Sequence, residues 1–428
     1  MSEQDGTQAT TKPRRSRQTS KQNGTQKAAL QRPTNDDKEA WHAYWKFLGQ
    51  PWRLEPEIDT MRQEYLSERL TIMPNWSQGF VSKRLTITPD WSQGIDPFMG
   101  IKLSRADIEW LLATHENGRG PVNWCDESQR ERDGLNLAGA DLWRVNLASL
   151  PLAKTDLSNA QLEGAFLAFV QLEKANLSRA KLQEAHLLVA ELQGADLSGA
   201  KLEKALLIEA QLQGANLTGA QLQGVNLSNV TLADAHHIGP QLADVQWGDT
   251  NLTVADWEQI TMLGDERVAA QKKGRYLRLV DYKAAVRAYR QLSVVLRNQG
   301  LNEDAARFTY RSQIMQRKVF WYQRKIGQYL FSLFLDLLAG YGYKPGRSFL
   351  AYAFVIGTFA ALYFYLGTHL AWNEAIVISM TAFHGRGFFP DQFHPGDPQA
   401  LVAALEAFVG LLIEVTFIAT LTQRLFGK

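Results

Sequence analysis

The sequence predicts a multidomain protein in which a β-solenoid is followed by a helical linker and a helical membrane region. Three observations predict this: a leucine at every fifth position in the middle of the chain, a helical spacing of apolar residues after residue 265, and two long apolar runs near the C-terminus. The hydrophobic fraction of 45% hides this asymmetry, because the first forty residues contain almost no large apolar side chains.

Residues 1–40 are expected to form a disordered basic arm. Seven basic and no acidic residues lie from Lys12 to Arg32, among Gln, Thr and Ser. Such a segment buries too little apolar surface to offset the entropy lost on ordering. The arm fits a solubilising tail, and contact with anionic lipid or nucleic acid is the alternative.

Residues 41–134 are expected to form an N-terminal capping region. RLTIMPNWSQG begins at Arg69 and is followed by RLTITPDWSQG from Arg84, which predicts a strand, a proline turn and a tryptophan anchor twice. A short helix beginning at Ala106 then covers the first coil of the solenoid, because solenoids need their ends covered.

Residues 135–257 are predicted to form the β-solenoid. Leucine occupies every fifth position from Leu137 to Leu232, twenty times in succession, and a small residue usually lies two positions before it. A period of five fits neither a helix nor a single strand, but it fits two inward residues, one outward residue and a corner. The same phase continues through His237, Leu242, Trp247, Leu252 and Trp257, whose bulk would close the end of the rod.

This segment resembles the pentapeptide-repeat family, as in AELQGADLSG from Ala190. The resemblance implies a right-handed quadrilateral β-helix with four repeats in each coil and with the leucine and the small residue stacked inside.

Residues 258–346 are predicted to form a helical hairpin linker and an interfacial helix. Helical spacing runs from Tyr282, breaks at Asn298-Gln-Gly and resumes at Asn302. The pair resembles one hairpin of the tetratricopeptide type, and a plain helical connector fits equally well. The amphipathic stretch from Trp321 to Leu338 is expected to lie along the inner membrane surface.

Residues 347–428 contain two predicted spans. Ser348–Leu370 has no charged residue and Ala400–Leu421 is almost entirely apolar, and each is long enough to cross the hydrocarbon core. Between them, a helix over Trp372–Ala382 leads into a glycine-containing turn. A short apolar helix followed by irregular backbone between two spans predicts a re-entrant pore loop.

This region resembles the two-transmembrane tetrameric ion channels of the potassium-channel type. Phe383-His-Gly-Arg-Gly aligns with that family's Thr-Val-Gly-Tyr-Gly and keeps both glycines, but the other three residues differ, so potassium selectivity does not follow. The resemblance implies a selectivity filter or pore loop formed by Thr381, Phe383, His384, Gly385, Arg386 and Gly387.

One face of the second span is predicted to line the pore, because residues spaced by three and four share a face. In a tetramer, Glu414 would form a ring of four carboxylates that attracts cations. Gly410 is expected to act as a hinge, and Phe417 or Leu421 to form an apolar constriction. Glu406 has a second interpretation, in which it lies behind the pore helix and is hydrogen-bonded to it. The predicted face consists of Glu406, Gly410, Glu414, Phe417 and Leu421.

Two further residues bear on permeation. Four copies of Arg386 would repel cations unless each is paired, and a salt bridge to Glu406 or Asp391 would remove this conflict. His384 either titrates near neutral pH and gates the pore or packs as a neutral residue.

Charge around the spans predicts a multi-pass cell-membrane protein with both termini in the cytoplasm. Positive residues precede the first span and follow the second, whereas Arg386 is the only one between them. The flanking positive residues are Lys318, Arg324, Lys325, Lys344, Arg347, Arg424 and Lys428.

The favoured function is therefore a homotetrameric ion channel subunit with a non-standard filter and a cytoplasmic solenoid that regulates or assembles it. The expected partners are membrane lipid, monovalent cations, further copies of the chain and a cytoplasmic protein, without nucleic acid. No catalytic motif, metal site or cofactor site is evident, so an enzyme is not expected. The alternative is a non-conducting, membrane-anchored protein-interaction module.

Overall fold

The computed structural model describes residues 31–71, 96–123, 125–341, 343, 345–366, 370–385 and 397–426. The chain divides into two compact units, Met1–Leu54 and Glu55–Lys428. The predicted capping region, 41–134, is therefore split between the units. Most of the duplicated segment lies outside the described residues, but its first three residues, from Arg69 to Thr71, end a helix and do not form the predicted strand.

The first unit contains helix α1 (Lys38–Phe47). Asp37 caps it by accepting a hydrogen bond from the Glu39 amide at 3.0 Å. Trp41 and Trp45 stack with their centroids 5.2 Å apart, and the guanidinium of Arg53 lies 3.4 Å from the Trp45 ring centroid. These local aromatic contacts give the unit its own small core.

The second unit begins with α2 (Thr60–Thr71) and α3 (Arg105–Gly118), and a short 3-10 helix, η2 (Glu127–Gln129), follows. Ser104 and Asp107 form a capping box at the start of α3. Arg105 donates hydrogen bonds to the carbonyls of Asn146 (3.1 Å) and Ala148 (3.0 Å). The helix expected after residue 105 is therefore present, and it binds the first coil of the solenoid.

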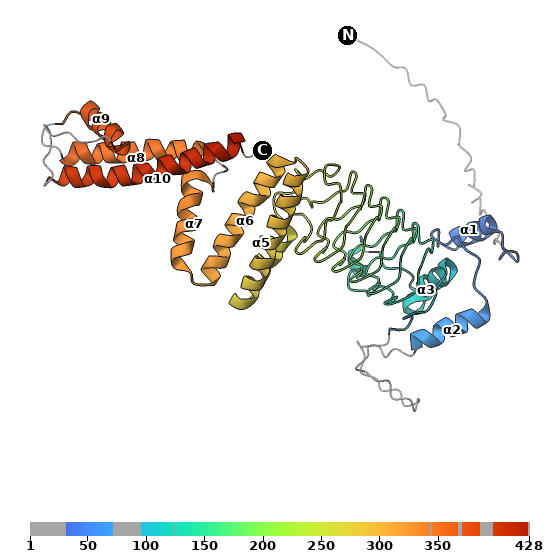
Figure 1. Cartoon of the computed structure of the whole chain (residues 1–428). Helices are drawn as coiled ribbons and strands as arrows, with labels where there is room; N and C mark the ends of the chain where they lie inside the picture. The colour runs from blue at the N-terminus through green and yellow to red at the C-terminus, as the bar shows by residue number, and fades with distance from the viewer. Residues whose placement is uncertain are drawn as a thin grey trace, which may run out of the picture. The chain divides into compact units, whose positions relative to one another are not determined.

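The solenoid is built from parallel pairings that recur every twenty residues, such as Asn136 with Asp156 and Asp156 with Asn176. Twenty residues are four pentapeptides, so each coil has four sides, and Figure 1 shows the coils stacked between α3 and α5. The repeated leucines and small residues are buried, as Leu197 and Ala200 illustrate at 0% exposure. The predicted inward pair is confirmed.

Each pentapeptide turns at the second residue after its leucine. The amide of Ala140 bonds to the carbonyl of Leu137 at 3.1 Å, and Gly139 between them has φ of 67°. A positive φ at this position is typical of a type II turn and favours glycine. This explains why glycine recurs there, although Arg144 and Lys174 adopt the same conformation.

The twenty-residue spacing of the coils breaks near the end of the rod. Asn216 pairs with Gln241 and Gln221 with Gln246, so one coil is five residues longer than the others. His237 lies in this longer coil and is exposed, which corrects the prediction that it continues the inward phase. Trp247 and Trp257 are buried as predicted, with their ring centroids 6.1 Å apart.

Four helices follow: α4 (Gly264–Gln271), α5 (Arg275–Asn298), α6 (Asn302–Tyr322) and α7 (Ile326–Ala339). Asp265 accepts hydrogen bonds from the amides of Leu242 (2.7 Å) and Ala243 (3.1 Å) in the last coils. Glu266 accepts from Tyr289 on α5 (3.0 Å) and Arg311 on α6 (2.8 Å). Buried polar contacts therefore fix the helical hairpin to the end of the solenoid.

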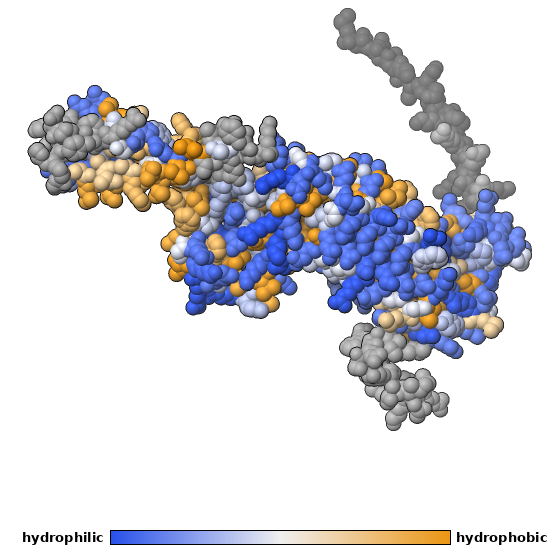
Figure 2. All heavy atoms as spheres, viewed as in Figure 1, coloured by the Kyte–Doolittle hydropathy of each residue, from blue (hydrophilic) through white to orange (hydrophobic). Residues whose placement is uncertain are grey.

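The chain ends in α8 (Pro345–Leu366), α9 (Trp372–Phe383) and α10 (Pro398–Phe426). Two of them, α8 and α10, are long and apolar enough to cross a membrane. Only 17% of the apolar window of α8 and 28% of that of α10 is buried. Figure 2 shows the resulting hydrophobic surface along the C-terminal hairpin.

Candidate functional site

Helix α9 packs along the inside of the hairpin formed by α8 and α10. The rings of Trp372 and Phe364 lie 5.5 Å apart at its start, and those of Phe383 and Tyr352 lie 4.8 Å apart at its end. Between these points, Ser379 donates a hydrogen bond to the Ile356 carbonyl at 3.0 Å. The helix thus begins beside the last turn of α8 and ends about 20 Å further down, beside Tyr352 on α8 and Gly410 near the middle of α10.

Glu406 holds α9 against α10. Its side chain is fully buried, accepts a hydrogen bond from Ser379 and lies beside the Tyr363 hydroxyl. A carboxyl enclosed in this way does not face an aqueous path, so the pore-lining prediction for Glu406 is wrong. The alternative, in which Glu406 lies behind the short helix, is confirmed.

Phe383 and Gly410 form the tight contact at the end of α9. Phe383 is 1% exposed, and a Cβ added at Gly410 would overlap its carbonyl oxygen and lie 2.9 Å from its carbonyl carbon. Gly410 therefore lets two helices approach closely, and its role as a hinge stays a prediction. Phe383 itself ends the helix, which corrects its assignment to an irregular filter strand.

Thr381 is also helical. Its hydroxyl donates to the carbonyls of Val377 and Ile378 in its own helix, each at 2.9 Å. It is therefore satisfied by its own helix and does not lie in irregular backbone as a filter residue would.

A polar cluster follows at the point where α9 ends. His384 Nδ1 hydrogen-bonds to the Glu414 carboxylate, and its Nε2 lies 3.3 Å from the Tyr352 hydroxyl. The His384 and Glu414 side chains are 42% and 37% exposed. Gly385, with φ of 70°, turns the backbone away from the helix axis. This cluster joins all three helices.

The remaining predicted residues divide into two groups. Phe417 lies one turn beyond Glu414 and is half-buried. Arg386, Gly387 and Asp391 lie outside the described residues, as does the side chain of Leu421. The predicted pairing of Arg386 with Asp391 or Glu406 stays a prediction. The Glu406 carboxyl is enclosed by Ser379 on α9 and Tyr363 on α8.

The link between the hairpin and the helices before it does not follow from the sequence pattern. Asp336 on α7 accepts hydrogen bonds from Arg317 on α6 (2.7 Å), Tyr310 on α6 (2.9 Å) and Arg347 on α8 (3.1 Å). Burial favours the neutral acid, but the hydrogen bonds from Arg317 and Tyr310 outweigh it and hold the pKa of Asp336 below its ordinary value. The sequence feature that could have indicated this link is Asp336 itself, the one carboxylate in the mainly apolar helix α7.

Comparison with known proteins identifies the solenoid. The family model described as pentapeptide repeats matches eight copies in residues 133–167, 152–188 and 190–229. A solved pentapeptide repeat protein from Nostoc PCC 7120 is 32% identical over 25% of this chain and 83% of its own, with a TM-score of 0.16. The chain belongs to the pentapeptide-repeat family.

Two other pentapeptide-repeat proteins of known structure are similar. HetL, described as involved in heterocyst differentiation regulation in the cyanobacterium Nostoc sp. strain PCC 7120, is 34% identical over 26% of this chain, with a TM-score of 0.21. Rfr23, from the cyanobacterium Cyanothece 51142, is 33% identical over 26% of this chain, with a TM-score of 0.20. The chain spans 52% of HetL and 65% of Rfr23. No curated protein matches the chain.

Proposed function

We propose that this pentapeptide-repeat protein is a cation-conducting ion channel subunit that assembles as a homotetramer. The single observation that carries the proposal is the course of α9, which enters the hairpin beside the end of α8 and stops against Gly410, near the middle of α10. A short helix that ends at mid-span exposes backbone at membrane depth, and such backbone is tolerated where it lines water or is covered by protein.

The cluster at the end of α9 supports an aqueous path. His384 and Glu414 are both partly exposed beside helices α8 and α10, whose exposed residues are mostly apolar. Ionisable groups within a span are unfavourable in hydrocarbon and usually face a protein interior or water. Four copies of Glu414 around an axis would attract cations, and the turn at Gly385 would lead into the pore loop.

The apolar surface supports assembly in a membrane. Phe354, Tyr365 and Phe408 are 74%, 83% and 63% exposed, which lipid and neighbouring copies would cover. The excess of positive residues outside the hairpin favours cytoplasmic termini at the cell membrane. The solenoid then lies in the cytoplasm, where a protein partner could reach it.

The contacts at Asp336 offer a route from the solenoid to the pore. Asp336 binds Arg317 on α6 and Arg347 at the start of α8, while Glu266 and Asp265 fix the preceding helices to the last coils. A partner that shifts the solenoid would therefore move α8 through hydrogen-bonded, partly buried groups.

The test is ion flux through the purified full-length protein in liposomes, with reversal potentials measured in asymmetric KCl and NaCl. We expect cation flux, and Glu414→Gln should lower it by about tenfold because the carboxylate ring is lost. Glu184→Gln, which changes an exposed solenoid carboxylate, is the matched control and should conduct like wild type.

The channel proposal would be overturned if a folded, correctly inserted oligomer shows no ion flux over a range of voltages, pH values and ions. That result would favour a membrane-anchored interaction module instead. Equal conduction by wild type and Glu414→Gln would keep the channel but remove Glu414 from the pore.

A further inference from the structure

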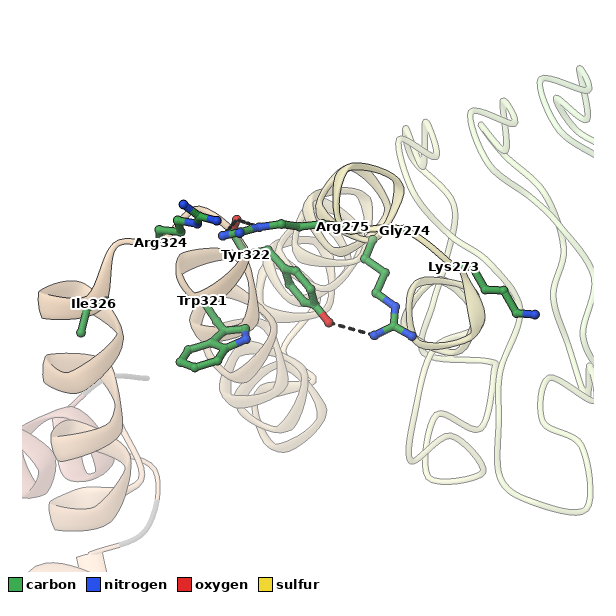
Figure 3. Close-up of a pocket in the computed structure, with 8 residues that line it drawn as sticks. Lys273, Gly274, Arg275, Trp321, Tyr322, Arg324 and Ile326 are labelled. Atoms are coloured by element: carbon green, nitrogen blue, oxygen red, sulfur yellow. Dashed lines mark hydrogen bonds between the residues drawn. The ribbon is translucent and has the colours of Figure 1, made fainter.

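A hollow of about 700 Å³ lies where the start of α5 meets the turn between α6 and α7. Four of its eight lining residues are basic and none is acidic. Figure 3 shows Arg275 reaching from α5 to the end of α6, next to the turn that carries Arg324. The lining consists of Lys273, Gly274, Arg275, Arg278, Trp321, Tyr322, Arg324 and Ile326.

The positive charge of this hollow is not neutralised by carboxylates within the described residues. Residues 271–280 and 321–328 contain six basic and no acidic side chains. Arg275 donates to the Tyr322 carbonyl at 3.0 and 2.8 Å, and Arg278 donates to the Lys272 carbonyl at 2.7 Å and the Tyr322 hydroxyl at 3.2 Å. Each of these acceptors is uncharged, so the guanidinium groups are oriented but keep their charge available for an anion.

The start of α5 adds to this preference. The helix is 24 residues long, its N-cap is Gly274, and no side chain caps it. Unpaired first-turn amides and the helix dipole favour a negative group at such an end. Together with the guanidinium groups, they form a site for a phosphate or a similar oxyanion.

The residues around the hollow favour a membrane lipid as the source of this phosphate. Trp321 and Ile326 in the lining are 59% and 63% exposed, and Tyr276, which follows Arg275 in the sequence, is 74% exposed. Ile326 begins α7, whose Phe331 and Leu337 are 63% and 74% exposed, and Figure 1 shows α7 running crosswise to α8 and α10, which it meets at its C-terminal end. A helix that runs crosswise to two spans and carries an exposed apolar face fits the membrane surface.

We propose that this hollow binds the phosphate headgroup of an anionic membrane lipid, with Trp321 and Ile326 against its acyl chains. Basic groups beside exposed tryptophan, at the start of an apolar helix that leads to a span, suit the headgroup region. The inference rests on the membrane placement of α8 and α10 from the proposed function, but it does not require that the protein conducts ions. A bound lipid would hold α5, α6 and α7 together where the solenoid joins the membrane unit.

The experiment measures lipid binding to the detergent-solubilised full-length protein by native mass spectrometry, with phosphatidylglycerol and phosphatidylcholine as probes. We expect tight binding of phosphatidylglycerol only. Lys273→Gln/Arg324→Gln should weaken it by about tenfold, because two charges are lost. Neither side chain donates a hydrogen bond to another described residue, so the variant should fold like wild type.

The matched control is Arg119→Gln/Lys204→Gln, which removes two exposed charges elsewhere and should bind lipid like wild type. The proposal would be overturned if both double variants lose phosphatidylglycerol binding equally, or if wild type binds the two lipids equally well. Displacement of the lipid by millimolar inorganic phosphate would also overturn it, because the site would then serve a soluble anion. Lipid binding is measured independently of ion flux. A protein that binds phosphatidylglycerol but conducts no ions would therefore contradict only the channel proposal.

Discussion

The solenoid and the C-terminal hairpin are both rich in leucine, but the solenoid buries its large apolar side chains and the hairpin exposes many of them. In the solenoid, leucines such as Leu197 are fully buried within a single chain. In the hairpin, Phe354 and Phe408 are 74% and 63% exposed. The solenoid therefore completes its core by itself, whereas the hairpin needs lipid or another copy of the chain to cover its surface.

The difference extends to polar groups. Carboxylates of the solenoid lie mostly on its surface, and its ladders repeat the same contact every twenty residues. The hairpin instead contains single polar contacts, Glu406 with Ser379 and His384 with Glu414, each of which occurs once. Loss of one repeated contact should be tolerated better than loss of a contact made once.

The largest effect is expected from Gly410→Ala. The new methyl group would overlap the Phe383 carbonyl, and because two helix backbones must separate, we expect a loss of about 4 kcal/mol of stability and the loss of the folded hairpin. Thermal unfolding of the full-length protein in detergent measures it. Gly357→Ala on α8 is the control, since no atom lies within 4 Å of its added Cβ. Similar unfolding midpoints for the two variants would show that α9 does not pack against α10 in this way.

A smaller effect should separate the two regions directly. Leu197→Ala removes a buried solenoid side chain and should cost about 3 kcal/mol, because it leaves a cavity in a closed core. Phe354→Ala removes a larger side chain from the hairpin but should cost little in detergent, which covers that face. Equal losses, measured by the same unfolding experiment, would show that Phe354 is buried against another copy of the chain.

The smallest effect concerns one buried carboxyl in the solenoid. Burial, reinforced by Glu191, raises the pKa of Glu173 to about 7, above its ordinary value of 4.5. The stability that protonation provides is present below pH 4.5 and is lost as the pH rises through 7. Glu173→Gln should therefore gain about 1 kcal/mol at pH 8, and this advantage should vanish by pH 4.5.

Unfolding midpoints at the two pH values check this prediction. Glu184→Gln, whose side chain is 65% exposed, should show no such pH dependence. An advantage of Glu173→Gln that is the same at both pH values would contradict the role of ionisation.

The sequence predicted the solenoid well because each pentapeptide carries the same local information. Leu142 and Leu197 are buried for the same reason, and one misplaced residue, His237, marks the longer coil where the repeat is interrupted. The membrane region was predicted in outline only. The spans and the short helix follow from apolar length, but helical spacing alone placed Glu406 and Glu414 on one face and could not assign them different neighbours.

The sequence by itself determined the repeat, the corner in each pentapeptide and the apolar length of two spans, because these depend on local spacing. The tertiary structure alone decided that Glu406 faces Ser379 while Glu414 faces His384, since a helix face is assigned by what packs against it. It also decided that Asp336 joins α6, α7 and α8, and that Arg275 and Arg324 share one hollow. These residues lie far apart in the sequence, so only packing brings them together.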